Sequence, residues 1–140
     1  MKKITESWFQ GHYKRVLDSK GRLSIPLEFL DVLNERFSDA LVLTHHYDPC
    51  LWVFPTNEWV KIKEKAAKLP LFNRAATLHL RYFISGAVEC RIDSEGRIII
   101  PSELYDVGGI RNKIVLAGTG KYMEIWDEDN WNKENKGAFE

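Results

Sequence analysis

The chain has 140 residues, of which 44% are hydrophobic and 29% are charged. This length suits one domain, or two small ones that share a core, and the composition excludes extensive disorder. The longest apolar run, IIIP from Ile98, is far too short to cross a bilayer, and no apolar stretch follows the lysines of the N-terminal MKKITESW. We therefore expect a cytoplasmic protein without a membrane span or a signal peptide.

The charge is balanced overall but uneven along the chain. Lysine and arginine together number 20, as do aspartate and glutamate, so the formal net charge is zero. Residues 1–82 hold 13 basic against 9 acidic side chains, whereas residues 83–140 hold 7 against 11. Such a distribution allows a basic face on a neutral molecule, so a nucleic-acid partner is not excluded.

The predicted elements begin with a strand that holds Lys14 and Arg15, a tight turn at DSKGR and a second strand at RLSIP. Alternating apolar residues and β-branched content predict this strand and the next one, LVLTH. Pro26 can start a helix, because a proline in the first helical turn loses no needed hydrogen bond. Asn57 is the predicted cap of a helix over EWVKIKEKAAK.

The segment from about residue 57 to residue 85 has no full counterpart later in the chain. It reads as a helical pair broken at LPLFN, with Pro70 as the breaker. Asn73 is the predicted cap of the second helix, over RAATLHLRYFIS. An insert of this kind more often packs or mediates oligomer contact than performs chemistry.

The elements after residue 85 repeat those of the first part. The segments LDSKGRLSIPLEF, from Leu17, and IDSEGRIIIPSEL, from Ile92, share seven of thirteen residues at one offset. More weakly, ALVLT resembles KIVLA and VFPTNEW resembles IWDEDNW. The second copy therefore has its own strand, turn and strand, a helix started by Pro101, and a last helix capped by Asp127 or Asp129. Self-similarity at one offset indicates two copies of one structural unit.

The predicted fold is mixed α+β and β-rich. We place the first unit at residues 9–62, a helical connector at 63–85 and the second unit at 86–134, with flexible tails at 1–8 and 135–140. A unit of about 50 residues buries too little surface to be stable alone. No linker rich in Gly, Ser or Pro separates the copies. We therefore expect the units to interleave their strands into one pseudo-two-fold domain with short helices.

The repeated turn has a structural interpretation. Asp18 and Asp93 can accept backbone N–H bonds within their turns, and Gly21 and Gly96 supply the positive φ that a type I turn with a bulge requires. The arginine that follows each glycine, Arg22 in the first copy, could pair with the aspartate and brace a β-hairpin.

The turn also has a functional interpretation, in which its cations bind DNA. Arg22 is joined by Lys20, Arg15 and Lys14 in a short window, and an arginine fork suits a phosphate or a guanine edge. We expect these four residues to be the main DNA contacts. Arg97 is expected to be secondary, because Glu95 stands where the first copy has Lys20. Both interpretations remain open for the arginines.

The chain resembles the MraZ family from about Phe9 to Trp131. The motifs that carry the resemblance are FQGHYKRVLDSKGRLSIP, CLWVFPTNEW, LPLFN, SGAVECRIDSEGRIIIP and EIW. The resemblance implies two AbrB/SpoVT-like swapped-hairpin units per chain and ring-like homo-oligomers. It further implies binding to double-stranded DNA at direct repeats upstream of the division and cell-wall gene cluster, usually with repression, and hence association with the nucleoid. The family's Asp-x-x-x-Arg motif falls on Asp18 to Arg22 and on Asp93 to Arg97.

Other candidate sites are weaker. His45, His46, Asp48 and Cys50 form a cluster with metal-ligating side chains, but adjacent strand residues point to opposite faces, and we expect no metal. GTGK from Gly118 lacks the spacing of a phosphate-binding loop. Cys50 and Cys90 are expected to be buried, reduced thiols. We therefore expect no enzyme, no cofactor and no small-molecule substrate. The alternative to a DNA-binding regulator is an oligomeric protein-interaction or antitoxin-like module whose arginines bind an acidic partner.

Overall fold

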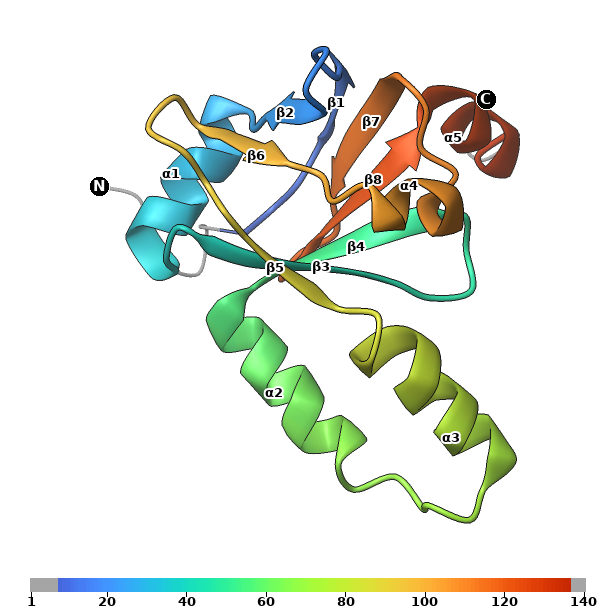
Figure 1. The fold of residues 1–140 in the computed structure, drawn as a ribbon. Coiled ribbons are helices and arrows are strands. Elements are labelled where there is room, and N and C mark those ends of the chain that lie inside the picture. The colour runs from blue at the N-terminus through green and yellow to red at the C-terminus, as the bar shows by residue number, and fades with distance from the viewer. Residues whose placement is uncertain (1–7, 137–140) are drawn as a thin grey trace.

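The computed structural model describes residues 8–136, which form a mixed α+β fold with a mainly antiparallel sheet (Figure 1). The strands are β1 (His12–Val16), β2 (Arg22–Ser24), β3 (Ala40–His45), β4 (Cys50–Pro55), β5 (Val88–Arg91), β6 (Arg97–Ile99), β7 (Lys113–Gly118) and β8 (Met123–Asp127). The helices are α1 (Leu27–Arg36), α2 (Thr56–Ala66), α3 (Arg74–His79), the π-helical turn η2 (Leu80–Ile84), α4 (Glu103–Gly108) and α5 (Glu128–Glu134). No described helix is long and apolar enough to span a membrane.

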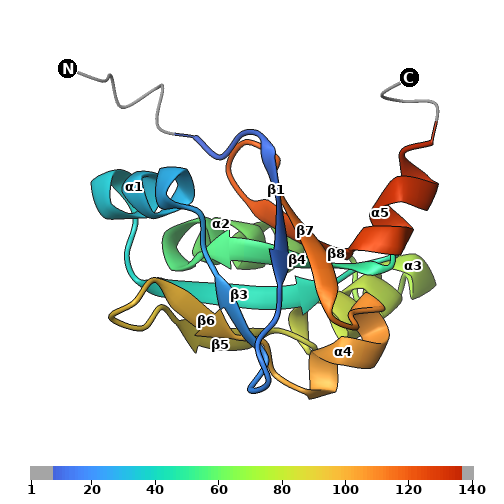
Figure 2. The ribbon, with the colours of Figure 1, turned by 90° about the horizontal axis from the view of Figure 1, so that it is seen from above.

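The strands form two sheets whose order reflects the repeat. The larger sheet has the order β1-β7-β8-β4-β3-β5, and β2 pairs with β6 in a separate two-stranded ribbon. If each strand is replaced by its counterpart in the other copy, the order of the large sheet reads the same from its opposite edge. Strands of the two copies pair at β1–β7, β4–β8, β3–β5 and β2–β6. In Figure 2, β1 and β7 run steeply across β3 and β4, which shows the strong twist of the sheet.

This pairing corrects one expectation. The sequence predicts a hairpin around each DSxGR turn, but the flanking strands do not form a ladder with each other. Two hydrogen bonds, from Asp18 N to Arg22 O and from Gly21 N to Asp18 O, close the first turn. The strand before the turn, β1, belongs to the large sheet, and the strand after it, β2, belongs to the ribbon. A tight turn fixes only local geometry, and the apolar faces of these strands find better partners in the other copy.

The main core lies between the large sheet and the ribbon. It contains Leu23 and Ile98 from the ribbon, with Leu41, Leu116 and Ile125 from the large sheet, all at most 1% exposed. A smaller cluster around Phe54 of β4, Trp59 of α2 and Phe83 of η2 packs these two helices on the other face of the sheet. Both copies contribute to the main core, as expected for units too small to fold alone.

The predicted connector and caps have mixed outcomes. The break at Pro70 is confirmed, and Asn73 caps α3 through a hydrogen bond from Ala76 N to its Oδ1 (3.1 Å). The cap predicted at Asn57 is wrong, because α2 already begins at Thr56 directly after β4. Asp127, one of the two caps predicted for the last helix, occupies the position before α5, but its side chain makes no capping hydrogen bond.

The predicted tails lie mostly outside the described residues, in 1–7 and 137–140. Trp8, assigned to the first tail, packs on the guanidinium of Arg36, whose carbon lies 3.9 Å from the centre of the indole. Residue 8 therefore belongs to the folded part of the chain.

Candidate nucleic-acid interface

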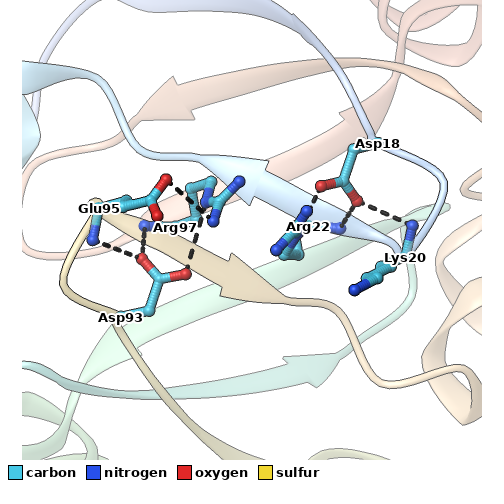
Figure 3. Close-up of polar contacts among 6 residues, drawn as sticks. All are labelled: Asp18, Lys20, Arg22, Asp93, Glu95 and Arg97. Atoms are coloured by element: carbon cyan, nitrogen blue, oxygen red, sulfur yellow. Dashed lines mark hydrogen bonds and ion pairs between the residues drawn. The ribbon is translucent and has the colours of Figure 1, made fainter.

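The β2–β6 ribbon places the two repeated arginines on one face. Leu23 lies opposite Ile98, and on either side of this pair Arg22 lies opposite Ile99 and Ser24 opposite Arg97. Leu23 and Ile98 point into the core, being 0% and 1% exposed. Because side chains alternate along a strand, Arg22, Ser24, Arg97 and Ile99 share the outer face. Figure 3 shows Arg22 and Arg97 side by side, with a DSxGR turn at each end of the ribbon.

The first turn holds Arg22 through Asp18. Asp18 Oδ1 accepts hydrogen bonds from the backbone N–H groups of Lys20 and Arg22, both at 2.9 Å, and Asp18 Oδ2 accepts one from Arg22 Nε. The bond from the Arg22 backbone N–H, with the Arg22 side chain and the Lys20 backbone, lowers the pKa of Asp18 from 3.8 to about 2. Asp18 therefore stays ionised at neutral pH and orients the Arg22 guanidinium.

The second turn repeats this arrangement with an added acid. Asp93 Oδ1 accepts hydrogen bonds from the backbone N–H groups of Glu95 and Arg97, both at 2.9 Å. Arg97 Nε lies 3.4 Å from Asp93 Oδ2, which makes an ion pair without hydrogen-bond geometry. Arg97 Nη2 lies 3.1 Å from Glu95 Oε2. The backbone N–H of Arg97 is the main cause of the lowered pKa of Asp93. Arg97 thus contacts two carboxylates and Arg22 one.

The two glycines also connect the turns to the opposite copy. Gly21 and Gly96 have φ values of +75° and +76°, which favour glycine because they lie in the left-handed region. The carbonyl of Gly21 accepts from Ile100 N at 3.1 Å, and that of Gly96 accepts from Ile25 N at 2.9 Å. The glycines therefore support both the turn and the pairing of the two copies, in agreement with the structural interpretation of the motif.

The other predicted DNA contacts do not form one cluster. Lys14 and Arg15 are neighbours on β1, so they project from opposite faces of that strand. Lys14 Nζ lies 3.2 Å from Glu128 Oε1 of α5. Arg15 lies over the ring of Tyr13 and donates from Nη1 to Lys14 O at 2.9 Å. Lys20 is exposed at the tip of the first turn, two residues before Arg22. Of the other predicted DNA contacts, it is the one in the same turn as Arg22.

The charge of the ribbon and its turns is balanced. Three cations, Lys20, Arg22 and Arg97, face three carboxylates, Asp18, Asp93 and Glu95. The first turn has an excess of one positive charge and the second an excess of one negative charge. Ser24 and Ile99, which share the outer face with the arginines, were missed by the sequence analysis, although the two-residue alternation of the strands would have placed them there.

The histidine cluster lies where β3 ends. Adjacent residues of a strand point to opposite faces, but the chain turns after His45, so His45 and His46 line one cavity. His46 Nε2 lies 3.3 Å from His79 Nδ1, and the imidazole of His46 stacks on Trp52. Cys50 is fully buried. Among the described residues, no three His, Cys, Asp or Glu side chains converge as a metal site would require.

Comparison with known proteins gives a consistent family. A family model described as "MraZ protein, putative antitoxin-like" matches the chain twice, over residues 8–82 and 83–137. The transcriptional regulator MraZ of Caldicellulosiruptor bescii is 43% identical over 124 residues, which cover 89% of this chain and 84% of that protein. The proteins of the same name from Alkaliphilus metalliredigens and Carboxydothermus hydrogenoformans are 41% and 38% identical, over 91% and 93% of this chain and 86% and 88% of theirs. The chain therefore belongs to the MraZ family.

Proposed function

We propose that the protein is a sequence-specific DNA-binding transcriptional regulator that acts without catalysis. The observation that carries the proposal is the ribbon face, on which Arg22 and Arg97 lie side by side between two turns. The names of the related proteins, all transcriptional regulators, agree with this function. The proposal extends to what the family resemblance implies: a repressor that works in the cytoplasm, at the nucleoid, on direct repeats upstream of the division and cell-wall gene cluster.

The ribbon offers hydrogen-bond donors that suit DNA recognition. The major groove of B-form DNA admits a two-stranded β-ribbon, and an arginine fork binds guanine O6 and N7. Arg22 donates its Nε–H to Asp18, which leaves the four N–H groups of its terminal nitrogens for a base edge or a phosphate. Because Asp18 fixes the guanidinium, little side-chain freedom is lost on binding. Lys20, exposed beside it, is placed for a phosphate. Arg97, with two carboxylates, contributes less.

Self-association completes the proposal. We assign the fold to two AbrB/SpoVT-like swapped-hairpin units, at residues 9–62 and 86–134, joined by a helical connector at 63–85. The cross-copy strand pairing and the palindromic sheet order support this assignment. Identical chains in a ring-like homo-oligomer would present several first turns to successive repeats. Linked weak contacts then multiply into tight binding, and the repeat spacing adds specificity.

The experiment is a DNA titration with two variants and one control. Fluorescence anisotropy measures binding to the protein's own upstream DNA at several salt concentrations. Arg22→Ala is expected to weaken binding by about 1–3 kcal/mol, and Lys20→Ala to lower the slope of log K against log salt by about 0.9 per lost phosphate contact. Lys63→Ala, which removes an exposed cation on α2, is expected to bind as the wild type does. Equal binding by Arg22→Ala and wild type, with unchanged folding, would refute the interface.

One observation favours a second function. Arg22 and Arg97 already contact carboxylates, and the charge of the ribbon and its turns is balanced. Such a surface also suits an oligomeric protein-interaction or antitoxin-like module. The acidic side chains of a protein partner would then replace the chain's own carboxylates as the ion-pair partners of the two arginines. This alternative predicts that no DNA fragment binds, while a protein partner co-purifies and is lost in Arg22→Ala.

A further inference from the structure

The loop between α2 and α3 carries two exposed apolar side chains. Leu71 is 69% exposed and Phe72 is fully exposed. We name these two residues the apolar tip. The helical pair stands away from the sheet in Figure 1, and the tip lies at its far end. Large apolar side chains that are exposed next to one another mark interaction surfaces in many soluble proteins.

An apolar cavity lies where the same helical pair joins the body of the protein. It measures about 320 Å³, and it is lined by Tyr47, Leu78, Tyr82, Val107 and three histidines, His45, His46 and His79. Tyr47, Tyr82 and Val107 are 74%, 51% and 45% exposed, so the apolar wall faces solvent in the single chain. A cavity of this kind can take one or two apolar side chains.

The tip of a chain cannot enter the cavity of the same chain. The segment from Arg74 to Leu78, the first cavity residue after the tip, is α-helical and rises roughly 6 Å at 1.5 Å per residue away from the tip. Bringing Phe72 back would require this segment to unfold. The tip and the cavity can therefore meet only between two copies of the chain.

The protein has a second cavity with an apolar wall, and charge favours the first of the two as the binding site for the tip. Lys68 and Arg74 flank the tip, and no acid lies between them. Exposed Asp48 and Asp106 lie next in the chain to Tyr47 and Val107 of the cavity. Burial lowers the pKa of His45 and His46, which favours their uncharged forms at neutral pH; His79 is the third histidine of the lining. Arg81 is exposed nearby but does not line the cavity.

The second cavity is larger, about 600 Å³, and has an aromatic wall of Trp52, Phe54 and Tyr122. Four lysines and two glutamates also line it: Lys61, Lys65, Lys68, Lys121, Glu58 and Glu64. This excess of positive charge opposes a tip that is itself flanked by cations.

We propose that the apolar tip of one copy, Leu71 and Phe72, docks into the cavity between Tyr47, Tyr82 and Val107 of the next copy. The contact is heterologous, because each chain offers the tip on one side and the cavity on another, so it closes into a ring if the rotation permits. The inference rests on the self-association proposed above and names the surfaces that meet.

The first experiment measures molar mass in solution by light scattering after gel filtration. Leu71→Ser and Phe72→Ser are expected to shift the oligomer toward the monomer. Leu27→Ser is the matched control, because Leu27 on α1 is 68% exposed, against 69% for Leu71, and is expected to keep the wild-type mass. An unchanged mass for both tip variants in an oligomeric wild type overturns this inference alone. A monomeric wild type overturns both this inference and the proposed self-association. The DNA titration described above tests DNA binding independently of either result.

The second experiment tests which cavity receives the tip. Chains with Phe72→Cys and chains with Val107→Cys are mixed and oxidised. The native thiols of Cys50 and Cys90 are buried and do not compete. A covalent pair that forms in this mixture and not in either variant alone supports the proposal. A pair that forms instead between Phe72→Cys and Lys121→Cys, or no pair at all, overturns it.

Discussion

Replacing Gly21 by alanine tests how the first turn is held against the other copy. The φ of Gly21 is +75°, a conformation that an alanine adopts at a cost of about 1–2 kcal/mol. A Cβ at this position would clash with the hydroxyl oxygen of Tyr105 on α4, so one of the two must move. Overpacking of this kind adds about 1–3 kcal/mol. The variant is therefore expected to lose about 2–5 kcal/mol of unfolding free energy.

Two further substitutions separate these costs. Tyr105→Phe removes the hydroxyl, after which the nearest atom to the new Cβ is the ring carbon Cζ at 3.5 Å, an ordinary contact. Gly120→Ala has a positive φ of +97° with nothing within 4 Å, so it reports the conformational cost alone. Combined with Tyr105→Phe, Gly21→Ala is expected to lose only about as much as Gly120→Ala, about 1–2 kcal/mol.

The assay is urea unfolding followed by far-UV circular dichroism, at one fixed protein concentration because self-association adds to stability. The four proteins of the cycle are the wild type, both single variants and the double variant. A coupling energy of about 1–3 kcal/mol between Gly21→Ala and Tyr105→Phe is expected. If Gly21→Ala loses the same free energy in both backgrounds, the hydroxyl contact is not what restricts this position.

Two other predictions follow from the titratable groups. The pKa of Asp18 is lowered from 3.8 to about 2 in the folded chain, so its ionised form stabilises the fold above the unfolded pKa, and this stabilisation is lost as the pH falls toward 2. The melting temperature of the wild type should therefore fall more steeply than that of Asp18→Asn between about pH 4 and pH 2; parallel curves would contradict the role of Asp18. Burial raises the pKa of Cys90 to about 11 and also raises that of Cys50. Neither thiol should react with an aromatic disulfide reagent until the protein is unfolded in denaturant, and rapid reaction of the native protein would show that the core around them opens.

Much of the local structure followed from short-range patterns. The strands around the two DSxGR turns, the break at Pro70 and the cap at Asn73 all lie where the sequence predicts them. Each depends on a property of a few neighbouring residues, such as a glycine at positive φ or a side chain that caps a helix. The failed cap at Asn57 shows the limit, because the end of β4 decides where α2 begins.

The arrangement of the candidate site could be predicted only in part, for the same reason. The sequence places Lys14, Arg15, Lys20 and Arg22 within nine residues, but strand alternation sends Lys14 toward Glu128 and Arg15 toward Tyr13. No local pattern shows that Arg22 would lie beside Arg97, 75 positions later, because that depends on the pairing of β2 with β6.

The sequence by itself determined that the chain has two copies of one unit, where most of their strands and turns lie, and which family it belongs to. Only the tertiary structure decided which strands pair, because a turn sets the direction of a strand and not its partner. Each copy is too small to bury its own apolar faces. The two strands that flank the first turn therefore pair with the other copy and not with each other: β1 pairs with β7, and β2 pairs with β6. The face that carries Arg22 and Arg97 exists only as a result of that exchange.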